Sequence, residues 1–86
     1  MVARNPHPFK HKSDIEKRYE FGEVEVSLND TVTFGSFDNS VALLTGKLYK
    51  KSDGTEMTTT NALNVLTVTG AGTNVDCLYL AWGYKA

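Results

Sequence analysis

The sequence predicts an all-β protein, a small antiparallel β-sandwich or barrel of about six strands with an extended N-terminal arm. Three observations predict this class. Apolar and polar residues alternate with a period of two in several stretches of the 86-residue chain. Asn, Asp and Gly, which favour turns, separate these stretches, and no stretch has a convincing helical period. We therefore divide the chain into an arm, residues 1–18, and a β-domain, residues 19–86.

The arm is expected to be extended, flexible and basic. Pro6 and Pro8 restrict their own backbone and that of the preceding residues to extended conformations. Ser13 and Glu16 have the spacing of a capping box, which allows one helical turn over residues 14–18, although a single turn is marginal in water. The arm has five Lys or Arg against two Asp or Glu, whereas the β-domain has four against eight. A basic arm of this kind can bind an acidic surface.

The first strand of the β-domain is expected over residues 19–28. Three of its residues alternate with polar neighbours and share one face: Val24, Val26 and Leu28. Tyr19 and Phe21 have the opposite parity, so we expect a bulge or bend at Gly22 that turns both sets toward one core.

A turn and a short strand follow. Asn29-Asp30 is typical of a turn, and residues 31–34 resume the alternation with Val32 and Phe34 inward. Phe37, in the next loop, is also expected to point inward.

Residues 41–50 are interpreted as one long strand that is bent or bulged near Gly46. Asp53-Gly54 predicts a hairpin turn, because glycine readily adopts the positive φ angles that such turns require. Residues 55–60, rich in threonine, are expected to form the returning strand, and residues 61–64 the next turn.

The last two strands are expected over residues 65–69, with Leu66 and Val68 on one face, and over residues 75–82. A glycine-rich loop separates them. Residues 75–82 are apolar at both parities, which indicates a strand buried on both faces, either in the centre of a sandwich or against another subunit.

The residues that usually carry chemistry do not form a recognisable site in the sequence. Cys77 is the only cysteine, so an intrachain disulfide and a thiolate metal site are excluded, and we expect a buried, inert thiol. His7 and His11 lie in the arm, where a rigid catalytic pocket is not expected. We therefore expect a protein that is not an enzyme and that has no cofactor and no metal site.

Two further patterns have ordinary explanations. Glu23 and Glu25 share one strand face with Cα atoms about 7 Å apart, which suits acid–base or metal chemistry, but outward glutamates also keep a strand soluble. Residues 70–72, Gly-Ala-Gly, begin like a phosphate-binding turn but lack the third glycine and the helix. We interpret both as structural.

The aromatic residues near the strand ends allow a binding platform for sugar or single-stranded nucleic acid. They are Tyr49, Tyr79, Trp82 and Tyr84. Only Lys85 lies among them in the sequence, so core packing and subunit contact are favoured over a platform.

The size of the chain favours self-association. A domain of 86 residues is close to the lower limit for independent folding, and small domains gain stability from disulfides, metals or oligomerisation. The first two are excluded above, so a homo-oligomer is expected. No signal-peptide pattern and no apolar run of about 20 residues is present, so we expect a soluble protein without a membrane partner.

Four runs resemble small all-β virion proteins of tailed bacteriophages. They cover residues 24–35, 50–58, 64–70 and 78–83, and the shared pattern consists of Thr/Val-rich strands, a Ser-Asp-Gly hairpin and an apolar C-terminal strand ending in Gly. The resemblance implies a head decoration or cement subunit, encoded near the major capsid protein and located in the virion after assembly in the host cytoplasm. Such a subunit binds the major capsid protein or other virion subunits and stabilises the shell.

Under this hypothesis, the expected contact elements are an edge strand open to β-augmentation and the arm. The contact residues expected in the arm are Arg4, Phe9, Lys10, Lys12, Ile15, Lys17 and Arg18. The alternative is a β module that binds carbohydrate or a cell-surface receptor through its aromatic residues. A nucleic-acid partner for the arm is disfavoured by the acidic β-domain.

Overall fold

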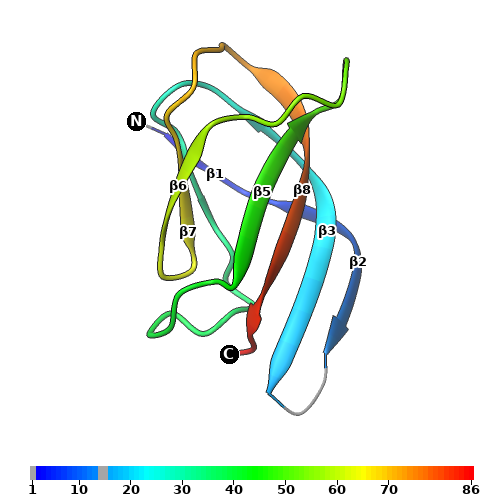
Figure 1. Cartoon of the computed structure of the whole chain (residues 1–86), viewed down its shortest axis with the longest axis vertical. Coiled ribbons are helices and arrows are strands. Elements are labelled where there is room, and N and C mark those ends of the chain that lie inside the picture. Colours follow the sequence, from blue (N-terminus) through cyan, green and yellow to red (C-terminus); the bar gives the residue numbers. More distant parts are fainter. Residues whose placement is uncertain (1, 14–15) are drawn as a thin grey trace.

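The computed structural model describes residues 2–13 and 16–86 and contains two four-stranded β-sheets that enclose one apolar core (Figure 1). The all-β class is therefore confirmed, and the sheets are not closed into a barrel. No helix occurs among the described residues, and so none is long and apolar enough to cross a membrane.

One sheet, which we call the short sheet, has the strand order β1 (Ala3–Arg4), β4 (Thr31–Thr33), β7 (Val65–Val68) and β6 (Thr59–Ala62). The other, the long sheet, has the order β2 (His7–Ser13), β3 (Lys17–Val26), β8 (Val75–Tyr84) and β5 (Thr45–Lys50). Neighbouring strands are antiparallel except β1 and β4, which are parallel. The described residues therefore form eight strands, more than the six expected.

The N-terminal segment is extended, but it belongs to the sheets and is not a separate arm. It crosses from the short sheet, where β1 pairs with β4, to the long sheet, where β2 pairs with β3 (Figure 1). The reason is that β3 would otherwise present a row of unpaired N–H and C=O groups, which an extended neighbouring segment can satisfy. Of the expected helical turn, residues 14 and 15 lie outside the described residues, and residues 17–18 already belong to β3.

The expected bulge at Gly22 is wrong for β3, which pairs with β8 in unbroken register. The irregularity lies instead in β2, between Pro8 and Lys10, directly opposite Gly22. Because β3 keeps its parity, Phe21 stays on the side away from the core and is 41% exposed. Glycine is needed at position 22 because the backbone of β2 crosses very close to it. A Cβ atom there would lie 2.1 Å from the carbonyl oxygen of His7.

The core contains most of the residues predicted to point inward. Of those, the ones found buried are Val24, Val26, Val32, Phe34, Phe37, Leu66, Val68 and Cys77. Leu28 is an exception: β3 ends at Val26, and Leu28 lies exposed in the turn that leads into Asp30. The alternation in the sequence therefore predicts the inner faces of β3, β4 and β7 correctly.

The segment around β5 differs from the long bent strand expected there. Residues 41–44 are irregular, and β5 begins at Thr45 and pairs regularly with β8 through Gly46. The Asp53-Gly54 turn is confirmed, with φ of 76° at Gly54. The returning strand expected over residues 55–60 is wrong: the segment makes one bridge to β5, between Glu56 and Tyr49, and then crosses to the short sheet as β6. Because β6 extends to Ala62, the turn that follows is shorter than the expected 61–64.

Candidate protein-binding face

The outer face of the long sheet, the side away from the core, carries a row of exposed apolar side chains. The apolar residues of β8 alternate between the two sides of the sheet. Cys77, Tyr79 and Ala81 are buried in the core, whereas Leu78, Leu80 and Trp82 are 42%, 37% and 42% exposed on the outer face. The sequence allowed two interpretations of this strand: burial on both faces in the centre of a sandwich, or burial of one face against another subunit. The first is wrong for the isolated chain, because the outer face of β8 is exposed.

Strand register extends this row into a wider patch. Tyr19 and Phe21 of β3 lie beside Trp82 and Leu80, and Tyr49 of β5 lies beside Leu78. The rings of Tyr19 and Phe21 are stacked, with centroids 6.1 Å apart. We call this patch the apolar stripe: Tyr19, Phe21, Tyr49, Leu78, Leu80 and Trp82.

Lysines lie at one end of the stripe and beside it. Lys12 is the register partner of Tyr19, and Lys10 is the register partner of Phe21. The Lys17 amino group lies 6.0 Å from the centre of the Tyr84 ring. A shallow depression of about 510 Å³ is lined at this end by Lys12, Ser13, Lys17, Arg18, Tyr19 and Trp82. We call this region, around Lys12 and Lys17, the basic end of the face.

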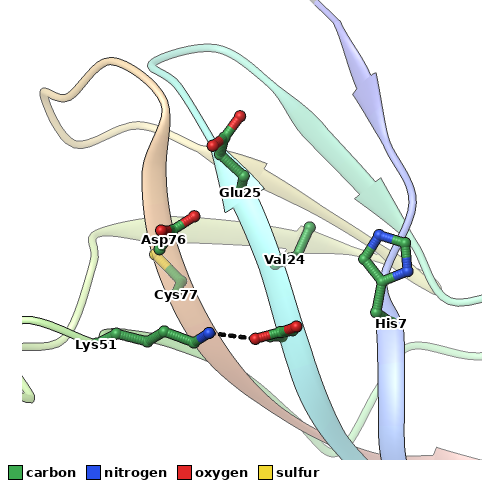
Figure 2. Close-up of a pocket in the computed structure, with 7 residues that line it drawn as sticks. His7, Val24, Glu25, Lys51, Asp76 and Cys77 are labelled. Atoms are coloured by element: carbon green, nitrogen blue, oxygen red, sulfur yellow. Dashed lines mark hydrogen bonds and ion pairs between the residues drawn. The ribbon is translucent and has the colours of Figure 1, made fainter.

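The opposite end of the same face carries Glu23, Glu25 and Asp76, and we call it the acidic end. A depression of about 280 Å³ lies here (Figure 2). Lys51 reaches across β8 and donates a hydrogen bond to the Glu23 carboxylate, and this bond raises the pKa of Lys51. Among the described residues, no group of three or more His, Cys, Asp or Glu side chains could hold a metal ion. The side chains of Glu23 and Glu25 are 38% and 49% exposed.

Arg4 was expected to contact a partner, but in this structure it binds within the chain. Its Nε lies 2.7 Å from Oδ2 of the buried Asp30, and its Nη1 lies 3.4 Å from Glu25 Oε1. Asp30 also accepts hydrogen bonds from the backbone N–H groups of Ser27 and Val2. This network attaches β1 to the turn after β3.

The Asp30 network predicts a loss of stability in acid. Burial raises the pKa of Asp30, but the hydrogen bonds from Ser27, Arg4 and Val2 outweigh it and lower the pKa below the usual 3.8. The unfolded carboxyl group therefore takes up its proton first, and the stabilisation is lost as the pH falls from about 4 through the folded pKa. Thermal unfolding of Asp30→Asn from pH 2 to 7 should show a lower midpoint at pH 7 and a flatter decline below pH 4. An unchanged decline would contradict this assignment.

The other expected contact residues are placed differently from one another. Arg18 is largely buried and binds Glu20, His11 and Ser13 within the chain. Phe9 is exposed at the irregularity of β2, and Ile15 lies outside the described residues. Lys10, Lys12 and Lys17 flank the apolar stripe, as described above. Their contact with a partner remains a prediction.

Sequence reasoning missed the contribution of β3 to this face. Tyr19 and Phe21 were assigned to the core through the expected bulge, yet they share the parity of Glu23 and Glu25, which were expected to point outward. The apolar residues change parity at Gly22, so the sequence pattern gave no signal that Tyr19 and Phe21 lie on the outer face. Tyr79, in contrast, is buried and cannot take part in the aromatic platform considered above.

The edges of the long sheet are poorly suited to β-augmentation. β2 carries Pro8, an irregularity and two lysines, all of which discourage pairing with a further strand. The edge of β5 is partly covered, because Lys50 N–H donates to the Thr55 carbonyl and Met57 N–H donates to the Leu48 carbonyl. The outer face is therefore the better candidate for binding.

The chain matches no known family model, no curated protein and no solved structure, so its functional interpretation depends on the geometry of this face and on the sequence pattern.

Proposed function

We propose that this protein is a non-enzymatic β-sandwich subunit of a virion shell that binds neighbouring protein subunits through the outer face of its long sheet. The observation that carries this proposal is the apolar stripe. Three large side chains of one central strand, Leu78, Leu80 and Trp82, are each more than a third exposed in one row. Contiguous exposed apolar patches rimmed by charge are typical of protein interfaces.

A protein partner fits this face better than a sugar or a nucleic acid does. Aromatic residues are common at the centres of protein interfaces, where their burial supplies much of the binding energy. Leucine has no ring to stack on a base or a sugar, and two leucines occupy the middle of the stripe. The carboxylates of the acidic end would repel the phosphates of a nucleic acid.

The assignment to a virion is supported by the resemblance of the strand pattern to phage head proteins. A shell also presents many copies of its subunits, so individually weak contacts are strengthened by repetition. A small domain without a disulfide gains stability by mass action when it is bound in such a shell.

Co-sedimentation with shells of the major capsid protein that, as the resemblance implies, is encoded near this chain tests the proposal. Wild-type protein should pellet with the shells, whereas Leu80→Glu, which puts a charge in the middle of the stripe, should bind at least about tenfold more weakly. Leu63→Glu is the matched control, because Leu63 is similarly exposed but lies in the turn between β6 and β7. Pelleting of Leu80→Glu like wild type, or no pelleting of wild type, would contradict the proposal.

A carbohydrate- or receptor-binding module remains the second candidate, favoured by the depression between Tyr19 and Trp82. A glycan-array signal that a folded Trp82→Ala variant loses would support it over the shell subunit.

A further inference from the structure

We propose that the outer face of the long sheet binds the same face of a second copy of this chain, in a two-fold dimer with the acidic end of each face over the basic end of the other. This inference rests on the proposed function and identifies the protein that binds the outer face as a second copy of the chain.

The charges of the face are separated along the strands. On β3, Lys17 and Glu25 both point outward, eight residues and therefore about 27 Å apart. The acidic end continues onto β8 with Asp76, and its three carboxylates outnumber the two cations that pair there, Lys51 with Glu23 and Arg4 with Glu25. The basic end continues onto β2 with Lys12. A surface with opposite charges at its two ends is complementary to a reversed copy of itself.

The centre of the charges coincides with the centre of the apolar stripe. The midpoint between Lys17 and Glu25 on β3 is Phe21, and the register partner of Phe21 on β8 is Leu80. Leu80 in turn is the midpoint of the exposed row from Leu78 to Trp82. A single two-fold axis at the level of Phe21 and Leu80 can therefore bring both the apolar and the charged groups of the two copies into contact.

The axis that satisfies both sets of contacts lies between the two faces and runs across the strands. It places Leu80 and Phe21 over their own counterparts, Leu78 over Trp82 of the other copy, and Glu25 over Lys17 of the other copy. An axis parallel to the strands would place acid over acid and base over base. Sheets pack face to face about 10 Å apart, a distance that extended Glu and Lys side chains can bridge.

Two lysines lie at the level of the axis, where each would face its own counterpart. Lys47, on β5, is already paired with Glu56, at 3.1 Å between Nζ and Oε2. Lys10 lies on the exposed edge strand β2, from which its long side chain can extend into water. Neither lysine therefore has to be buried unpaired.

The face is small for a stable interface. Four strands about 4.8 Å apart and about nine residues long cover roughly 550 Å², below the roughly 800 Å² per partner of a standard interface. We therefore expect a reversible dimer with a dissociation constant in the micromolar range, about 1–100 µM, which a crowded shell would keep associated.

The arrangement can be tested with two charge-reversal variants, whose dimerisation is measured by analytical ultracentrifugation, first separately and then in a mixture. Glu25→Lys alone gives two Lys–Lys contacts and Lys17→Glu alone gives two Glu–Glu contacts, so each variant should dimerise at least about tenfold more weakly than wild type. When the two variants are mixed, both contacts of the mixed dimer become Lys–Glu pairs, and association should return to near the wild-type level. The double variant, Lys17→Glu with Glu25→Lys, should dimerise by itself for the same reason.

Thr60→Lys is the control for charge alone, because it adds a charge on the exposed edge strand of the short sheet and should leave dimerisation unchanged. Circular dichroism melts show whether each variant is folded, since Glu25 also contacts Arg4. A monomeric wild type at about 500 µM, single variants that dimerise normally, or a mixture that fails to associate would each overturn the proposal.

The outcomes separate this inference from the proposed function. If wild type is monomeric but Leu80→Glu still loses shell binding, the face binds a different protein, so the inference fails and the shell role stands. If mixing restores the dimer but wild type does not pellet with shells, the inference stands and the virion role fails. Binding of a single-stranded oligonucleotide that displaces the dimer would count against both.

Discussion

Gly22→Ala is expected to lower the free energy of unfolding by about 3 kcal/mol and to detach β2 from β3. The new methyl group would lie 2.1 Å from the His7 carbonyl oxygen and 2.7 Å from the Pro8 Cα atom. Both are backbone atoms, so the clash can be relieved only by moving β2, which breaks its hydrogen bonds. Urea denaturation measures the loss, and faster amide exchange over residues 7–13 would locate it.

Gly35→Ala is the matched control for this substitution. A Cβ atom at Gly35 would have no neighbour within 4 Å, so the free energy of unfolding should change by no more than about 0.5 kcal/mol. If Gly22→Ala were as stable as Gly35→Ala, the close crossing of β2 over β3 would be wrong. Detachment of β2 would also remove Lys12 from the basic end of the outer face, so the proposed dimerisation should weaken in parallel.

Glu20→Leu is expected to destabilise the protein by about 3–5 kcal/mol, the typical cost of removing one partner of a buried ion pair. Glu20 is 3% exposed on the inner side of β3. Its carboxylate accepts a hydrogen bond from Arg18 Nη2 at 2.8 Å and another from the Tyr79 hydroxyl. Burial, together with the bond to Glu20, raises the pKa of Tyr79, so its hydroxyl stays protonated and keeps donating.

Without Glu20, the Arg18 guanidinium and the Tyr79 hydroxyl lose their partner inside the protein. Glu23→Leu is the control on the same strand, since Glu23 lies on the outer face in an exposed ion pair with Lys51 and should cost no more than about 1 kcal/mol. Adding Tyr79→Phe to Glu20→Leu should recover part of the loss, because one unpaired hydroxyl is removed. Equal effects of Glu20→Leu and Glu23→Leu in thermal denaturation would contradict the buried network.

Several features of the fold could be predicted because they depend on residues close together in the sequence. Alternation placed Val24 and Val26 inside, because successive side chains of a strand point to opposite faces. The turn at Asp53-Gly54 was predictable because a positive φ is a property of one residue. The same local reasoning failed at Gly22, where the need for glycine comes from a strand about fifteen residues away.

The candidate site was predicted only in part. The apolar character of residues 75–82 indicated either a central strand or a subunit contact, and the structure shows a central strand with one face exposed. Three lysines of the N-terminal segment were expected to contact a partner. They lie beside the stripe, but their spacing in the sequence does not predict this position. β2 pairs with β3, and this pairing carries Lys10 and Lys12 to the rim.

The sequence by itself determined the all-β class, the turns and most of the inward-facing residues, since side-chain alternation and backbone φ preferences act over a few neighbouring residues. Only the tertiary structure decided that the N-terminal segment joins both sheets and that Tyr19 lies beside Trp82, 63 residues further along the chain. Strand partners are chosen by backbone hydrogen bonds between distant segments, and every residue carries the same N–H and C=O groups for making them.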